Sequence, residues 1–421
     1  MNLDLAEKWF IDKDLSKSTQ SLYSLGLKKY CKLVGKDLEE LLDEAEEEED
    51  NIPRLRKRKI DSYIPGFKKS LEDANLAPQT IKVYVSAVKS FYKHYKITIP
   101  DVSTDVSDIC LEKNEGRLLT KEDIKLMIDD SKVREKAIIY LMAMTGMSQA
   151  EVRHLTIKKI LDAASEALDK KIETVEDLIE YEKELNDVVL SLLITREKVK
   201  YRYHSFIPPE VTKFIILYLK ERLYDRNEKI RISDVRKELF VNYSGKKLTK
   251  HSVSGNFNRL GKKLGFTASE KGAYGFWRSH GLRKYFISTI INETGDHVLA
   301  DYLVGHKINK TKRAYWKADP NKLKDKYLGL IEYLSLDGSK GSIIGSDDYK
   351  ELESKMKEMK ENFDKQVDEK VNEIVDEKVD EKVNEMFKEK IDSIEMLGND
   401  FRDELNKKFA DLSKEKSSPK D

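Results

Sequence analysis

Cysteine is scarce in this chain of 421 residues, which contains only Cys31 and Cys110. The two lie far apart and give no zinc-ligand spacing, and so few cysteines in a long chain are typical of a reducing intracellular compartment. The N-terminus is acidic and lacks the basic and apolar regions of a secretory signal. No apolar run is long enough to cross a bilayer, and the most apolar stretch, residues 137–147, indicates a buried helix. We therefore expect a cytoplasmic protein.

Motifs for nucleotide and metal chemistry are missing as well. The chain has no GxxxxGK phosphate loop followed by Ser or Thr. It also has no cluster of Asp, Glu and His residues that would demand a two-metal centre. We therefore expect no cofactor and no bound metal.

Net charge is small, at +1, but its distribution along the chain is uneven. Residues 346–421 contain 16 Lys and Arg against 24 Asp and Glu, a net charge of −8, which leaves +9 for the remainder. Ten of the acids in that remainder fall between Asp37 and Asp50. The rest of the body is therefore distinctly basic, as expected of a protein that neutralises backbone phosphates.

Hydrophobic spacing indicates helices throughout the first hundred residues. One is expected after Ser16 or Ser18, a second over residues 65–76 and a third over residues 79–95. The acidic run at residues 44–50, with basic residues after it, predicts a solvated loop or the end of a helix.

A second, larger unit should begin near residue 117. Thr120 and Asp123 have the spacing of a capping pair at a helix start. A helix over residues 133–145 should end at Gly146. The strongly charged residues 160–185 also have a helical pattern.

A small antiparallel hairpin is expected next. Residues 188–194 are apolar and rich in β-forming side chains, and residues 203–207 resemble a returning strand. Pro208 and Pro209 then open another helix, and helices dominate residues 253–334. The expected fold class is mainly α with a small antiparallel β-sheet (α+β).

The C-terminal part of the chain looks different from the rest. Residues 338–342 are rich in Gly and Ser and predict a flexible linker. From Leu352 to Ile391, apolar residues recur every three or four positions among charged ones, until Gly398 interrupts the pattern. This spacing predicts a long amphipathic helix, either a coiled coil or a single solvated helix.

One set of residues suggests chemistry on a phosphodiester. His280 and Arg283 are three positions apart and would share one face of a helix. His306 and Tyr315 follow, nine positions apart. An arginine can neutralise phosphate charge, histidines can hydrogen-bond or move protons, and a tyrosine oxygen can attack phosphorus.

This ordered set resembles the tyrosine recombinase (integrase) family over roughly residues 10–335. His280-Gly281-Leu282-Arg283 looks like the second box of the family. Val304-Gly305-His306 looks like its Leu-Gly-His element, and Tyr315 matches its nucleophilic tyrosine. HxxR alone is weak evidence, but the three elements in this order and spacing are specific.

Two further segments agree with the resemblance. Residues 195–200 are similar to the hairpin that carries the catalytic lysine of the family, and Lys198 matches that lysine better than Lys200. Residues 145–155 look like the first box, but Ser148 stands where the usual arginine falls. Arg153 resembles the displaced arginine of archaeal-type integrases.

The resemblance implies the following domains: residues 1–105, a helical core-binding domain with a SAM-like fold and a linker; residues 106–336, the catalytic domain; residues 337–346, a linker; and residues 347–421, a charged helical tail. It implies a site-specific recombinase that cleaves and rejoins DNA through a 3′-phosphotyrosine, without metal or ATP, and belongs to an archaeal virus, plasmid or integrated element. Implied partners are double-stranded attachment sites and further copies of the chain, a dimer on each site and a tetramer in the synapse. Alternatives are an inactive DNA-binding protein derived from an integrase, or a topoisomerase of the tyrosine type.

Every candidate also has a plainer interpretation. His280 could be a satisfied, partly buried histidine, and Arg283 could form a surface ion pair. Arg153 could pair with Glu151 or a nearby acid, and Lys198 could be one of many exposed lysines. His306 could cap a helix, and Tyr315 could be packed in the core. Because all six occur in family order, we favour the functional interpretation.

Overall fold

The structure is a computed structural model that describes residues 4–104, 117–196, 200–268, 275–308, 319–336 and 347–415. Helices dominate it, and the sheet found among these residues is a two-stranded antiparallel hairpin. The expected fold class is therefore confirmed. In the part of the chain that the structure describes, no helix combines the length and apolarity that a bilayer span needs.

The chain divides into two compact units, Met1–Asp123 with Ser254–Tyr285, and Ile124–Val253 with Phe286–Asp421. The chain passes between the units three times, inside helices α7 (Lys121–Asp129), α14 (Lys250–Lys263) and α15 (Ser279–Thr294).

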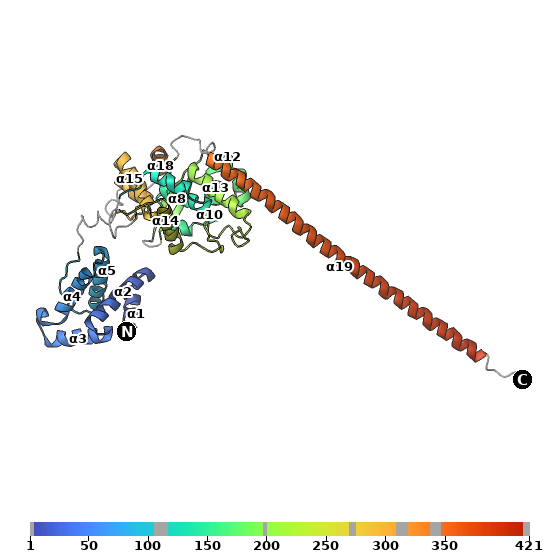
Figure 1. The fold of residues 1–421 in the computed structure, drawn as a ribbon, viewed down its shortest axis with the longest axis horizontal. Coiled ribbons are helices and arrows are strands. Elements are labelled where there is room, and N and C mark those ends of the chain that lie inside the picture. The colour runs from blue at the N-terminus through green and yellow to red at the C-terminus, as the bar shows by residue number, and fades with distance from the viewer. Residues whose placement is uncertain are drawn as a thin grey trace. The chain divides into compact units, whose positions relative to one another are not determined.

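Five α-helices fold together at the start of the first unit, with a 3-10 turn at Leu55–Lys57 (Figure 1). They are α1 Asp4–Asp12, α2 Lys17–Val34, α3 Leu38–Asn51, α4 Ile60–Asp73 and α5 Pro78–His94. Aromatic side chains fill the space between them: the Tyr30 ring meets Phe67 edge-on, and its hydroxyl lies 3.2 Å from that of Tyr92. A Cβ at Gly26 would lie 3.1 Å from the Tyr84 Cα, so a glycine allows α2 and α5 to pack closely.

Ser16 is the N-cap of α2, which decides between the two expected capping serines. The helix predicted over residues 65–76 was placed too late, because α4 begins at Ile60. Ile60 and Ile64 are buried with Phe67 on one helical face, so packing outweighs the cost of Pro65 in the helix interior.

The acidic run at residues 44–50 belongs to α3, so of the two expectations the helix end is confirmed and the loop is wrong. Leu38, Leu41 and Leu42 are buried on the other face of α3, and Asp37 caps it in a capping box with Glu40. An amphipathic helix can therefore carry this many acids on its exposed side.

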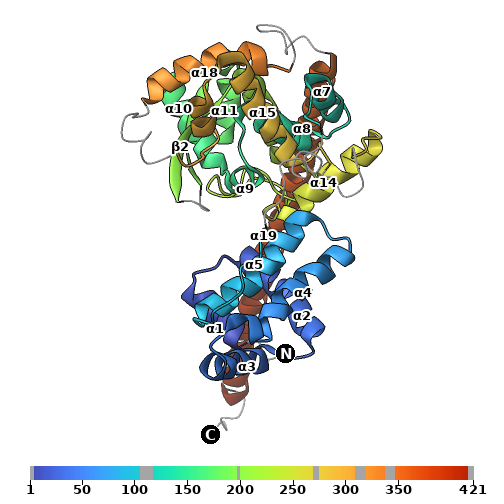
Figure 2. The ribbon, with the colours of Figure 1, turned by 90° about the vertical axis from the view of Figure 1, so that its left-hand side faces the viewer.

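The remaining elements up to residue 336 are mostly helices, and many of them are labelled in Figure 2. They are α7 Lys121–Asp129, α8 Val133–Thr145, α9 Gln149–His154, α10 Ile157–Leu168, α11 Val175–Glu180, α12 Glu182–Leu185, β1 Leu190–Arg196, β2 Tyr201–Ile207, α13 Pro209–Leu223, α14 Lys250–Lys263, α15 Ser279–Thr294, α16 His297–Leu303 and α18 Pro320–Leu334.

Helices α8 and α13 form the core of the second unit. Nearly every residue of α8 is buried, and Tyr140 stacks on Phe214 of α13 with ring centroids 4.3 Å apart. Tyr327 of α18 is fully buried and donates to the Met144 carbonyl at 2.5 Å, and burial raises the pKa of its phenol. Gly146 ends α8 in the left-handed region, as expected (φ 65°).

Other sequence expectations for this part are confirmed with adjusted bounds. Thr120 and Asp123 cap α7 reciprocally. The charged residues 160–185 are helical but form three helices, because Asp169 adopts φ 51° and ends α10. The predicted hairpin is present, with Leu190 paired to Ile207 and Arg196 paired to Tyr201.

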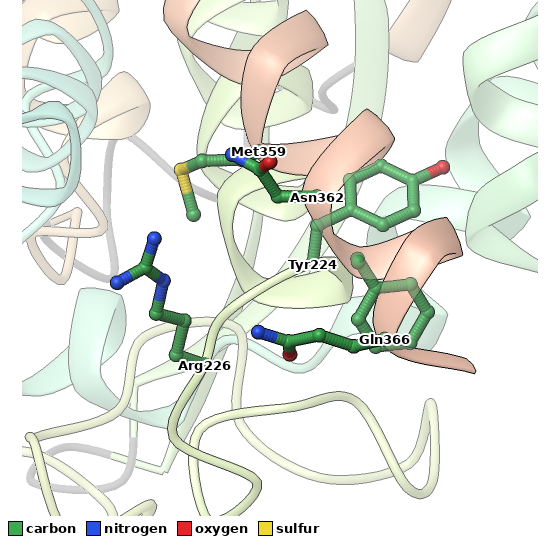
Figure 3. A pocket seen from close by; sticks show the side chains of 6 residues that line it. Tyr224, Arg226, Met359, Asn362 and Gln366 are labelled. Carbon is green, nitrogen blue, oxygen red and sulfur yellow. The ribbon is translucent and has the colours of Figure 1, made fainter. Parts of the chain in front are cut away.

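The C-terminal helix α19, Asp347–Glu415, runs continuously through Gly398, so the interrupted hydrophobic pattern does not end it (Figure 1). Its first turns pack against the end of α13. Phe363 lies between the Tyr224 ring, 5.8 Å away, and the Arg231 guanidinium, 4.6 Å away. Figure 3 shows Tyr224 and Arg226 facing Met359 and Gln366 across this contact.

Farther along α19 the apolar side chains that the structure describes are exposed. They include Val367, Val371, Ile374, Val375, Val379, Val383, Phe387 and Ile391. Many are four residues apart, so the stripe winds around a helix of 3.6 residues per turn. The expected linker at residues 338–342 lies outside the described residues.

Candidate active site

The first turn of α15 carries two candidates, His280 and Arg283. The His280 side chain is exposed, which makes the alternative of a partly buried structural histidine wrong. Arg283 is 3% exposed, so the alternative of a surface arginine is wrong as well. At three positions apart, the two side chains share one helical face.

A tight turn leads the chain into α15. The Arg278 carbonyl accepts from the Gly281 amide at 2.7 Å, and the Arg278 Nε donates to the Gly275 carbonyl at 3.1 Å. A Cβ at Gly281 would lie 1.9 Å from the Phe276 carbonyl oxygen. Only glycine fits between His280 and Arg283 at this position without moving the turn.

Three further cations surround His280 in a small depression of the first unit. Arg117, Arg278 and Lys284 line this depression with His280. Asp123 binds the Arg117 guanidinium through two hydrogen bonds of 2.5 and 2.8 Å, and the guanidinium lies 3.8 Å from the centre of the Phe276 ring. A concave surface with this concentration of positive charge attracts an anion such as a phosphate.

Arg153, from the first-box segment, lies on the six-residue helix α9. Its Nη1 donates to the Leu248 carbonyl at 3.4 Å, and burial lowers the pKa of its guanidinium. Among the described residues no acceptor lies within hydrogen-bond distance of the buried Arg153 Nε. The buried guanidinium therefore retains an N–H donor that no described acceptor uses.

Ser148, which replaces the usual family arginine, has a structural role here. Its hydroxyl caps α9 by accepting from the Glu151 amide, and its own amide donates to Glu151 Oε2 at 2.6 Å. This capping box fixes the start of the helix that carries Arg153.

His306 follows a left-handed turn at the end of α16. The Gly305 amide donates to the Tyr302 carbonyl and the His306 amide to the Asp301 carbonyl, each at 2.8 Å, which is a Schellman motif. The Asp301 carboxylate lies 2.8 Å from His306 Nδ1 and accepts a hydrogen bond from it, which leaves Nε2 as the ring nitrogen that Asp301 does not bind. His306 thus contributes its amide to the helix cap, and its ring remains 42% exposed.

Gly305 is required by its surroundings as well as by its backbone. It has φ 67°, and a Cβ there would lie 2.5 Å from the Tyr203 ring of β2. The hairpin and the His306 loop therefore pack in direct contact.

Lys198 and Tyr315 lie outside the described residues. Lys200, the alternative to Lys198, is exposed in the hairpin turn with φ 48°. Of the other candidates, His280 and Arg283 fall in the first unit, and Arg153 and His306 in the second.

Sequence reasoning assigned no role to Arg117, Asp301 or Arg196. Arg196 could have been noticed, because it continues the alternate, inward-facing positions of β1 after Leu192 and Ile194. An arginine in such a position requires acceptors. Asp301 is five residues before His306, and sequence alone does not show that a helix cap brings the two together.

Comparison with known proteins agrees with these features. The phage integrase family model matches residues 111–322, half of the chain. Over 216 residues, 49% of this chain and 49% of its own length, the tyrosine recombinase XerH of Campylobacter jejuni is 26% identical. A second relative, TTE1313 of Caldanaerobacter subterraneus, is 28% identical over 159 residues, 35% of this chain and 49% of its own. The chain thus spans about half the length of the curated relatives it matches.

Solved structures of recombinases are similar as well. XerH bound to palindromic difH substrate in a post-cleavage complex has a TM-score of 0.46 and 18% identity, covering 76% of this chain and 82% of that one. A lambda integrase fragment, residues 75–356, was solved as a dimer bound to a COC′ core site. It has a TM-score of 0.47 and 14% identity, covering 75% of this chain and 97% of that one. On the strength of the family match, this chain belongs to the phage integrase family.

Proposed function

We propose that this protein is a site-specific DNA recombinase (integrase) that cleaves and rejoins DNA through a tyrosine. The observation that carries the proposal is the buried Arg283, one helical turn from the exposed His280, within the segment that matches the family. A guanidinium with 3% exposure is costly to bury and is held in one place, as recognition of a scissile phosphate requires.

Tyr315 is the proposed nucleophile. A phenol has an unperturbed pKa of roughly 10, so at neutral pH it needs a base or a strongly cationic pocket to attack phosphorus. In-line attack increases negative charge on the non-bridging oxygens, which the guanidiniums of Arg283 and Arg153 would bind. His280 and His306 would hydrogen-bond the same group.

Lys198, with Lys200 as the alternative, would donate the proton that the leaving 5′ oxygen needs. The products of cleavage are a 3′-phosphotyrosine and a 5′ hydroxyl. The energy of the broken bond is retained in the phosphotyrosine, so rejoining needs neither ATP nor metal.

A nicked suicide duplex tests this proposal, because the cleaved end diffuses away and traps the covalent complex. Tyr315→Phe should bind the duplex as the wild type does and form no adduct. Tyr333→Phe is the matched control, since Tyr333 is 39% exposed on α18 and should form the adduct normally. An adduct that survives Tyr315→Phe would exclude Tyr315 as the nucleophile.

Double-stranded attachment sites and further copies of the chain are the proposed partners. Two copies would bind inverted half-sites and four would form the synapse, with strands exchanged in two rounds. The exposed apolar side chains of α19 favour the tail as a means of self-association. Origin in an archaeal virus or other integrated element stays a prediction.

A second candidate is a DNA-binding protein that descends from an integrase and has lost cleavage. It is favoured by Ser148, which caps α9 in place of the first-box arginine. Wild-type protein that shifts attachment-site duplexes in a gel, yet gives no adduct on any of them, would support this candidate over the recombinase.

A further inference from the structure

Three elements of the second unit meet at a single guanidinium, that of Arg196 at the end of β1. Its Nη1 donates to the carbonyls of Val304 and Gly305, both at 3.0 Å. Its Nε lies 3.9 Å from Glu151 Oε1 of α9. The side chains of Arg196 and Glu151 are 21% and 4% exposed, so both charges are largely removed from water.

Each of the three elements that meet at Arg196 also carries a candidate active-site residue, one or two positions after the residue in contact. The three pairs of contact residue and neighbouring candidate are Arg196 and Lys198, Gly305 and His306, and Glu151 and Arg153. A movement at the guanidinium would therefore be transmitted to Arg153 and His306 at once.

Arginine suits these acceptors better than any other side chain. The carbonyls of Val304 and Gly305 lie at the end of α16, where helix carbonyls lack internal partners and the helix dipole attracts a cation. In the planar guanidinium, Nη1 donates to both carbonyls while Nε faces the carboxylate of Glu151. A lysine carries its three donors on one nitrogen and lacks the second donor nitrogen that faces the carboxylate.

Glu151 connects the guanidinium to the first box. Its Oε2 accepts from the Ser148 amide at 2.6 Å, and its Oε1 faces Arg196. The carboxylate that caps α9 is therefore also the counter-charge of the arginine. Neutralising Arg196 would leave a buried carboxylate with less compensation, at the start of the helix that carries Arg153.

We propose that Arg196 is a positioning residue that holds the β1–β2 hairpin, the first-box helix and the His306 loop in the register needed for strand cleavage. The inference rests on the proposed function, and Arg196 acts through its neighbours without touching DNA.

Arg196→Met and Arg196→Lys test the inference in the full-length protein. Arg222→Lys is a matched control, because Arg222 also donates to backbone carbonyls of the second unit, those of Ile230, Glu238 and Leu239. All variants are assayed at saturating nicked duplex and well below their melting temperatures, so that differences in stability do not enter the rate.

The rate of adduct formation should fall on the order of 100-fold for Arg196→Met, the scale of a displacement of about 1 Å in an active site. The rate for Arg196→Lys, which keeps the charge, should lie between the rates for Arg196→Met and the wild type. DNA affinity should change by less than about threefold in both, because no phosphate contact is lost. Arg222→Lys should lower the melting temperature and leave the rate unchanged.

An NMR measurement separates failure of this inference from failure of the proposed function. Ring signals of His306 should shift in Arg196→Met and stay in place in Arg222→Lys, whether or not the protein cleaves DNA. Wild-type protein that gives no adduct would overturn the proposed function, and the His306 signals would then decide whether Arg196 positions the loop. An Arg196→Met protein with the wild-type cleavage rate, or with unshifted His306 signals, would overturn the inference.

Discussion

Replacement of Gly305 by alanine should disturb both the stability of the second unit and the position of His306. Two costs combine at this position. The backbone has φ 67°, where a side chain costs roughly 1 kcal/mol. The new Cβ would also lie 2.5 Å from the ring of Tyr203, which is fully buried and cannot move outward easily. Forcing the two apart should cost roughly 1–3 kcal/mol more, as in overpacked cores.

Gly295→Ala separates the two costs. Gly295 has the same φ of 67°, and nothing lies within 4 Å of its added Cβ. It should therefore report the backbone cost alone, lowering the melting temperature by roughly 2–4 °C. Gly305→Ala should lower it by roughly 4–16 °C, from the combined cost of about 2–4 kcal/mol.

Scanning calorimetry of both variants measures this difference, and adduct formation shows its consequence for the site. At a temperature where both variants are folded, Gly305→Ala should cleave more slowly than Gly295→Ala, because the loop that carries His306 must shift. Equal melting temperatures for the two variants would refute the argument that the hairpin and the His306 loop pack in contact.

Further predictions concern pH, salt and the tail. Burial raises the pKa of Glu221 from 4.5 to about 7, so its folded state binds the proton more tightly than the unfolded chain. The stability that this carboxyl contributes is complete below pH 4.5 and is lost as the pH rises through about 7. Thermal unfolding between pH 5 and 8 should show this loss of stability, and the loss should be absent in Glu221→Gln. DNA affinity should fall steeply between about 50 and 200 mM salt, and a flat response would contradict binding through phosphates. Removal of residues 346–421 should leave cleavage of a single site largely intact and weaken assembly; unchanged oligomer size and full recombination would refute the role of the tail.

Local signals in the sequence predicted much of the fold. Gly146 and the pair Thr120 and Asp123 mark helix ends that depend only on nearby residues, and both were correct. The predicted helix began at Pro65, whereas α4 begins at Ile60, because Ile60 and Ile64 belong to its buried apolar face. Tertiary packing decided that boundary, and local propensity did not.

For the candidate site, the sequence identified residues and left their supporting contacts hidden. His280 and Arg283 are three positions apart, so their shared helical face follows from spacing alone. The partners of Arg196, in contrast, are more than a hundred residues away along the chain at Val304 and Gly305. Contacts between such distant residues depend on how helices pack, and no local pattern specifies them.

The central claim is that the Tyr315 oxygen attacks a DNA phosphorus. Its most direct test is peptide mapping of the covalent complex trapped on a nicked attachment-site duplex. Mass spectrometry should find the nucleotide on the peptide that contains Tyr315. A nucleotide attached to any other residue would contradict the claim.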